Sequence, residues 1–249
     1  MAEPWVYLSP HFDDVVLSIG GLVYEQVQRG TAVEIWTICA GNVPANIPLS
    51  PFAQSQHTVW KIGDDVPKIR GREDVAACQM LGAHPHHLSV PDCIYRTLPG
   101  TNEPFVKTEQ DLFTPNANED YLTIQVGEYL QTNLPPGCQL VAPLGIGHHR
   151  DHILTRNAAE HLPMPLWYYA DYPYVGQTTV KLSDWVKPDA LEYEMSISSN
   201  GLQAWQNSIA CYHSQISMFW KSVEDMRTAI QMYWDSIHLL RDDVFLWKY

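Results

Sequence analysis

The chain has 249 residues, of which 45% are hydrophobic and 17% are charged. These values are ordinary for a folded globular protein and exclude intrinsic disorder and a collagen-like repeat. The 28 acidic residues outnumber the 15 basic ones, and the formal net charge of −13 repels nucleic-acid backbones and anionic lipids. We therefore expect no nucleic-acid partner and no membrane partner.

The N-terminus gives no sign of a targeting segment. It contains neither a basic nor an apolar run, and the sequence has no apolar stretch of about 18 residues that could cross a membrane. The cysteines are odd in number and lack C-x-x-C spacing, which favours reduced thiols over disulfides or a cysteine metal site. We expect a cytoplasmic protein.

Apolar and β-branched runs alternate along the chain with stretches of helical periodicity. In chain order they predict strand 5–9, helix 15–29, strand 32–40, helix 70–81, strand 87–90, helix 119–133, strand 139–144, helix 153–161 and strand 166–170. Parallel strands need long connections, which helices supply, so the alternation predicts an α/β sandwich with a mainly parallel sheet. In such folds ligands bind at the carboxyl ends of the strands.

Three regions depart from this alternation. Segments 41–68 and 92–118 are predicted to be irregular, and both leave strand carboxyl ends, where long loops often surround a functional site. Beyond residue 171 we expect an extended piece at 193–198, then a helical run from 202 to about 238 with a break between Lys221 and Asp225. We interpret residues 171–249 as a C-terminal helical appendage packed on an α/β core of residues 1–170, so that residues 1–249 form one domain.

The first cluster of polar residues is S-P-H-F-D-D, directly after the first predicted strand. A helix N-terminus stabilises a carboxylate, so capping alone would explain either Asp13 or Asp14, but not both together with His11. Taken alone, the segment leaves a metal site and a helix cap as alternatives. The Gly20–Gly21 pair within the following helix costs about 1 kcal/mol per glycine relative to alanine, and we expect a close approach of that helix to the sheet to offset it.

The second cluster is G-H-H-R-D-H at residues 147–152, after the fourth predicted strand. His149 and His152 are three residues apart and share one helix face. We expect Asp151 to orient His149 and to hold it in its charged form. The first and fourth strands are plausible neighbours across the switch point of the sheet, so the two clusters are expected to face each other.

Together the clusters offer two imidazoles and a carboxylate, from His11, Asp14 and His152, to a divalent metal with positions left open. Asp13 would then serve as a general base, because a carboxylate beside a metal-activated water can take its proton. His149 would stabilise the oxyanion or protonate the leaving amine. The chemistry that these residues predict is hydrolysis.

These motifs resemble those of the LmbE-like, or PIG-L, family of metal-dependent deacetylases. The resemblance covers roughly residues 5–220 and is carried by S-P-H-x-D-D with L-S-x-G-G, H-x-D-H, Arg70-x-x-Glu73, Ala77 to Gly82, Asp92 with Ile94-Tyr95-Arg96, and Tyr212-His213-Ser214-Gln215. It implies a Rossmann-like three-layer fold, zinc as the usual metal, with Fe²⁺ or another divalent ion as the alternative, and removal of an N-acetyl group from a glucosamine-containing small molecule or glycoconjugate.

The resemblance also implies roles for individual residues. It places the metal ligands at His11, Asp14 and His152, the general base at Asp13 and the catalytic histidine at His149. Sugar-holding positions fall on Arg70 and Asp92, and we expect Arg96 to meet an anionic or hydroxylated part of the substrate. The sequence departs from many relatives at Phe12, Val15 and Gly147, so it does not define the substrate more closely.

Two other functions remain as alternatives. Two histidines and a carboxylate also suit a non-haem iron oxygenase. A non-catalytic sugar-binding protein could retain the same fold. Self-association into a homo-oligomer is compatible with the sequence.

Overall fold

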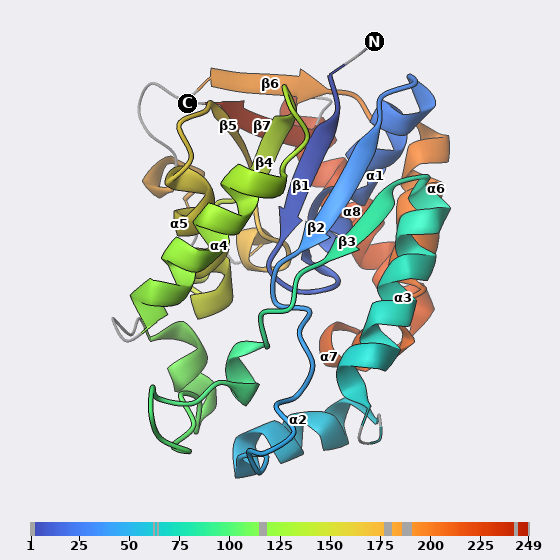
Figure 1. The fold of residues 1–249 in the computed structure, drawn as a ribbon. Helices are drawn as coiled ribbons and strands as arrows, with labels where there is room; N and C mark the ends of the chain where they lie inside the picture. Colours follow the sequence, from blue (N-terminus) through green and yellow to red (C-terminus); the bar gives the residue numbers. More distant parts are fainter. Residues whose placement is uncertain are drawn as a thin grey trace.

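The computed structural model describes residues 3–61, 63, 65–114, 119–176, 181–185, 191–241 and 244–248. Among these residues, seven strands form one sheet in the order β3-β2-β1-β4-β5-β7-β6 (Figure 1). The first five strands in the chain are parallel, and β7 pairs antiparallel with β5 and β6. The strands are β1 Trp5–Ser9, β2 Val33–Thr37, β3 His84–His87, β4 Gln139–Pro143, β5 Leu166–Tyr169, β6 Leu191–Met195 and β7 Val244–Lys248.

Helices cover both faces of the sheet. They are α1 Asp14–Gln28, α2 Pro51–Trp60, α3 Val66–Leu81, α4 Asp120–Asn133, α5 Arg150–Glu160, α6 Ser199–Ile209, α7 His213–Phe219 and α8 Val223–Arg241. Helices α1, α3 and α6 contact one another on one side, while α4 and α5 pack together on the other (Figure 1). Strand β1 contributes to both layers: Tyr7 belongs to the core on the α1 side, and Val6 and Leu8 belong to the core on the α4 side.

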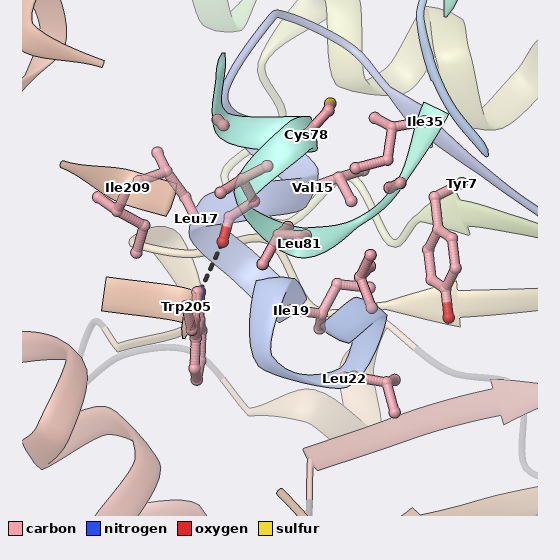
Figure 2. Packing of buried hydrophobic residues seen from close by; sticks show 14 of the residues in the cluster. Tyr7, Val15, Leu17, Ile19, Leu22, Ile35, Cys78, Leu81, Trp205 and Ile209 are labelled. Carbon is pink, nitrogen blue, oxygen red and sulfur yellow. Dashed lines mark hydrogen bonds between the residues drawn. The ribbon is translucent and has the colours of Figure 1, made fainter. Parts of the chain in front are cut away.

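A tryptophan from the late helix α6 explains the glycine pair in α1. The Trp205 indole nitrogen donates a 2.6 Å hydrogen bond to the Val16 carbonyl, and Ile19 has a non-helical φ of −146° (Figure 2). A side chain that inserts into the helical hydrogen-bond ladder kinks a helix in this way. A Cβ atom at Gly20 would lie 2.6 Å from the Trp205 ring. The close approach expected at this position is therefore made by α6 and not by the sheet.

The predicted α/β sandwich with a mainly parallel sheet is confirmed, and four of the five predicted strands lie where expected. The third prediction, 87–90, is wrong, because β3 covers His84–His87. Pro85 has no N–H to give to a sheet ladder, but β3 is an edge strand, where proline is tolerated.

The segment 41–68, predicted to be irregular, contains helix α2. Ser50 caps this helix by accepting a 3.1 Å hydrogen bond from the Ala53 N–H, and Pro51 occupies its first turn. The segment 92–118 contains the 3-10 helices Cys93–Tyr95 and Glu109–Phe113. Residues 62, 64 and 115–118 of the two segments lie outside the described residues.

The C-terminal region is partly as predicted. The break expected between Lys221 and Asp225 is found, since α7 ends at Phe219 and α8 begins at Val223. Two features were missed: a second interruption between α6 and α7, and strand β7, through which the appendage extends the sheet as well as covering it with helices. All five cysteines are free, as expected. In the described part of the chain, no helix combines the length and hydropathy needed to cross a membrane.

Candidate active site

The candidate site lies at the carboxyl ends of β1, β4 and β5. Strand β1 pairs with β2 on one side and with β4 on the other, so the chain reverses its direction of winding between β1 and β4. This switch point leaves a crevice in open α/β sheets. The loop that follows β1 carries His11, Asp13 and Asp14, and the turn that follows β4 leads to His149 and His152.

The loop after β1 is fixed by its own hydrogen bonds. The Ser9 hydroxyl donates to the His11 carbonyl at 2.5 Å and accepts from the Val15 N–H at 3.2 Å. The His11 N–H donates to the Asp14 carboxylate at 2.7 Å. Asp13 occupies the N-cap position of α1, but its side chain makes no capping hydrogen bond. The helix-cap alternative therefore does not account for Asp13, whose carboxylate is available for another role.

The turn after β4 requires unusual backbone angles. Gly147 has a φ of +88°, and His148 follows with a φ of +60°. A Cβ atom at position 147 would lie 2.6 Å from the ring of Tyr174, so glycine also allows that ring to approach. Next to this turn, His149 caps the N-terminus of helix α5, and its Nδ1 accepts a 3.3 Å hydrogen bond from the Asp151 N–H.

The two clusters meet at Asp14. One oxygen of its carboxylate lies 3.1 Å from His11 Nδ1, and the other lies 3.3 Å from His152 Nε2. Ligand atoms of a tetrahedral zinc ion stand about 3.3 Å apart when the bonds are about 2.0–2.1 Å long, and each of these two distances is close to that spacing. The rings of His11, His149 and His152 also offer nitrogens that lie within 4.8 Å of one another.

Asp171 holds the ring of His152 in place. Its carboxylate accepts from His152 Nδ1 at 2.6 Å and from the Ile146 N–H at 3.0 Å, and the residue is 1% exposed. A carboxylate bonded to the second nitrogen of a histidine is the usual partner of a metal-binding histidine, because it fixes the ring and its tautomer. Asp171 was not predicted from the sequence, although its position two residues beyond the end of strand β5 was a signal that could have identified it.

Asp151 does not lie where we expected. Its carboxylate is 3.0 Å from His11 Nε2 and is also bonded by Arg96 and, at 3.0 Å, by the Cys93 N–H. Only the backbone N–H of Asp151 reaches His149. The expectation that Asp151 holds His149 in its charged form is corrected by this geometry, because the Asp151 side chain is turned toward His11.

The expectation for Arg96 is corrected as well. Its guanidinium group is buried and forms ion pairs with Asp151 and with Glu119, the latter at 2.7 Å. Buried charges of this kind are stable when they are paired, and these partners leave Arg96 beneath the site. Arg96 is therefore engaged with Asp151 and Glu119, and it is not among the described residues that line the pocket with His11 and His152.

Arg70 and Asp92 line the pocket, as a sugar-holding role requires. Arg70 Nη2 donates to Asp13 Oδ1 at 3.1 Å, and its other terminal nitrogen lies 4.0 Å from Asp92. The Asp92 carboxylate is 3.9 Å from His11 Nε2, and together with Asp151 it forms a second group of donors around that histidine. Arg70 thus connects the expected base with the expected sugar-binding position.

Burial and charge shift the ionisation of these groups. Burial raises the pKa of Asp13 against the opposing effect of Arg70. Burial alone would also raise the pKa of Asp14, but His152 and His11 hold it well below its usual range. Burial lowers the pKa of His152, yet Asp14 and Asp171 raise it to about 9. Burial and the neighbouring imidazoles keep the pKa of His149 well below its usual range. The carboxylates around His11 and His152 therefore create a negative field that favours a cation, and a bound metal would replace the ring protons because histidine coordinates metals in its neutral form.

A pocket of about 550 Å³ opens over these residues. We call its charged inner part the floor, formed by His11, Asp13, Asp14, Arg70, Asp92, His149 and His152. We call its outer part the mouth, formed by Phe52, Gln56, Val59 and Trp60 of α2, by Glu109, Leu112 and Phe113, by Tyr172, Pro173 and Tyr174, and by Gln215, Met218 and Phe219 of α7.

The motif Y-H-S-Q at residues 212–215 contacts the loop after β1 and helix α3. The Tyr212 hydroxyl lies 2.7 Å from the Phe12 carbonyl and 2.8 Å from the Asp74 carboxylate. Ser214 bonds the Glu73 carboxylate through its N–H and its hydroxyl. Helix α3 thereby connects the start of α7 to the loop that carries His11 and Asp13.

The fold and this site define a class of protein: an α/β enzyme with a candidate metal centre at the switch point of a parallel sheet. The chain belongs to the PIG-L family, since the family described as "GlcNAc-PI de-N-acetylase" matches residues 6–162. This agrees with the resemblance that the motifs indicate. The chain is accordingly a hydrolase that acts on amide bonds, and its relatives are deacetylases.

Individual relatives support this assignment. The chain is 30% identical over 198 residues to 2'-N-acetylparomamine deacetylase of Niallia circulans, covering 72% of this chain and 70% of that protein. The zinc-inhibited form of teicoplanin deacetylase Orf2 superposes with a TM-score of 0.81 at 25% identity, over 98% of this chain and 97% of the other. N,N'-diacetylchitobiose deacetylase from Pyrococcus horikoshii, at 16% identity and a TM-score of 0.56 over 95% and 80% of the two chains, shares the fold.

Proposed function

We propose that the protein is a zinc-dependent deacetylase that removes the acetyl group from an N-acetylated sugar of the glucosamine type. The observation that carries this proposal is the meeting of His11 and His152 at the Asp14 carboxylate, with Asp13 beside them in one pocket. The family match and the deacetylase relatives support it. Fe²⁺ or another divalent metal would use the same donors.

A divalent metal bound by His11, Asp14 and His152 would supply a Lewis acid that activates water and polarises an amide carbonyl. Asp13 is placed to accept the proton of the attacking water, because its carboxylate lies in the floor and is restrained by Arg70. Burial raises its pKa, which makes it a stronger base than an exposed aspartate.

His149 acts on the other side of the reacting group. Its Nδ1 accepts a backbone hydrogen bond, which assigns the proton of the neutral ring to Nε2. That N–H would donate a hydrogen bond to the oxygen on which charge develops, and the proton that Asp13 takes from water would pass to the leaving amine. Arg70 and Asp92 would orient the sugar ring through its hydroxyl groups.

Within this proposal, residues 1–249 act as one domain in the cytoplasm. The contacts of α6 with both α1 and α3, and the pairing of β7 with β5, support a single unit. The free cysteines suit a reducing compartment.

The direct test is acetate release. The zinc-loaded protein is incubated with a panel of N-acetylglucosamine glycosides, and acetate and free amine are quantified together with oxygen uptake. We expect equal amounts of acetate and amine and no oxygen consumption. Oxygen uptake without acetate would indicate an oxygenase, and tight glycan binding without acetate release would indicate a sugar-binding protein; either result would refute the proposal.

A further inference from the structure

The mouth of the pocket has a different chemistry from the floor. Two helices that are distant in the sequence, α2 and α7, contact each other (Figure 1). Helix α2 lines the pocket with positions 52, 56, 59 and 60, and α7 lines it with positions 215, 218 and 219. These spacings place each set on a single helix face. Each face is mainly apolar, although it borders an open pocket.

The apolar side chains of the mouth are partly exposed to solvent. Val59 is 45% exposed, Met218 is 38% exposed and Phe219 is 41% exposed. The large hydrophobic side chains that the structure shows as exposed number eight, and these three gather at the same opening. Exposed apolar side chains that cluster beside a polar site mark a binding surface.

The charge of the mouth narrows the class of ligand. Among the described residues that line the mouth, Glu109 carries the only carboxylate, and none is a lysine or arginine. A phosphate or carboxylate group would therefore find no cationic partner there, and a group with several amines would find a single carboxylate. At the boundary with the floor, Arg70 stacks over the Trp60 ring at 5.2 Å, so the nearest guanidinium is already engaged.

We propose that the mouth is a subsite for an uncharged apolar aglycone, an aromatic ring or alkyl chain joined to the N-acetylated sugar that the floor holds. This inference rests on the proposed function. The mouth is continuous with the floor in one pocket of about 550 Å³, a volume in the range that accommodates ligands larger than a single small group. The sugar occupies the charged floor, and the aglycone covers Val59, Met218 and Phe219.

The test compares three substrates that differ only in the aglycone: the methyl, n-octyl and 6-aminohexyl glycosides of N-acetylglucosamine, below the concentration at which micelles form. The readout is the ratio of kcat/KM for each glycoside to that for the methyl glycoside. We expect the octyl ratio to be on the order of tenfold or more, because several methylene groups leave water, and the aminohexyl ratio to be lower.

Two variants test whether the mouth causes the preference for the octyl glycoside. The double variant Val59→Ser with Phe219→Ser is expected to bring the octyl ratio close to one. The matched control is Met232→Ser, since Met232 is an equally apolar side chain that is 66% exposed and lies outside the pocket lining. This control should leave the ratio unchanged. A ratio of kcat/KM values cancels any loss of folded protein.

Several outcomes would overturn the proposal. Equal kcat/KM for the methyl and octyl glycosides, a preference for the aminohexyl glycoside, or an octyl preference that survives the double variant would each refute the apolar subsite while leaving the deacetylase function intact. A change of oligomeric state in the double variant with an unchanged ratio would identify the mouth as a subunit interface instead. Absence of acetate release from every glycoside would contradict the deacetylase function itself.

Discussion

The floor and the mouth of the pocket are built in opposite ways. The floor consists of buried and half-buried charged groups on loops at strand ends and on helices α1, α3 and α5, and partners hold them, as Asp171 holds His152 and Arg70 holds Asp13. The mouth consists of partly exposed apolar groups on two helix faces. Charged groups in a buried site need fixed partners, whereas apolar contacts need only shape and area. We infer that the floor sets the reaction and the mouth sets which molecules reach it.

The largest expected effect is the loss of the metal. Chelation, or His152→Ala, should reduce kcat/KM by at least about a thousandfold, because a Lewis acid contributes several kcal/mol to the transition state. Zinc should restore the chelated wild type but not the variant, as measured by acetate release and metal content. His161→Ala, on an exposed histidine at the other end of α5, is the control and should keep its metal.

If the floor alone sets the chemistry, this loss should be the same for methyl and octyl glycosides. A loss restricted to one glycoside would show that the division between floor and mouth is wrong.

The next effect is removal of the base. Asp13→Asn should lower kcat by about 10²–10⁴-fold, the usual contribution of a general base. The side chain keeps its size and can still contact Arg70, so bound zinc, determined by metal analysis, should stay at the wild-type level. Near-normal turnover of this variant would mean that another group takes the proton.

A smaller effect is expected at Asp171. Asp171→Asn keeps the shape of the side chain but weakens the hold on His152 Nδ1, and changes at such positions typically cost about 10–100-fold in metal affinity or activity. Competition with a chelator would measure the affinity, and saturating zinc should recover most of kcat. An unchanged zinc affinity would remove Asp171 from the support of the floor.

The smallest effect is expected at Tyr212. Tyr212→Phe removes a hydroxyl that contacts the Phe12 carbonyl, and the loss of one buried hydrogen bond costs about 1–3 kcal/mol of stability. Because Phe12 lies between His11 and Asp13, we expect kcat to fall a few-fold as well, with KM unchanged. Tyr7→Phe is the matched control, since the buried Tyr7 hydroxyl bonds Gln26 at 2.7 Å, away from the pocket.

The control should lower Tm without changing kcat. Equal kcat values in the two tyrosine variants would show that Tyr212 contributes to stability alone.

The sequence predicted the floor better than its surroundings. The proximity of His11, Asp14 and His152 could be predicted because the carboxyl ends of neighbouring parallel strands lie at one edge of the sheet. The direction of the Asp151 side chain could not be predicted, since residue spacing places a residue on a helix face but does not choose between His11 and His149 as its partner. The roles of His11, Asp14 and His152 as metal ligands remain a prediction.

The mouth and the supporting residues were predicted least. Helix α2 was missed because its apolar residues are divided between a small core, which contains Ala53 and Trp60, and the pocket lining, so they do not form one clear periodic face. Strand β7 follows a helical run and pairs antiparallel, so the alternation of strand and helix gave no reason to expect it. Arg96 carries a charge that usually faces solvent, and its burial depends on Glu119, to which no local pattern connects it.

The positions of Asp171 and Tyr212 show how much of the chain is needed to hold the floor in place. Both lie beyond residue 162, at which the family match stops, yet one steadies an imidazole and the other a backbone carbonyl of the floor. A boundary drawn at the end of this family match would enclose every predicted metal ligand but leave out Asp171 and Tyr212, which hold parts of the floor in place. A fragment designed for expression, or for transfer of this site to another scaffold, should therefore include Asp171 and Tyr212.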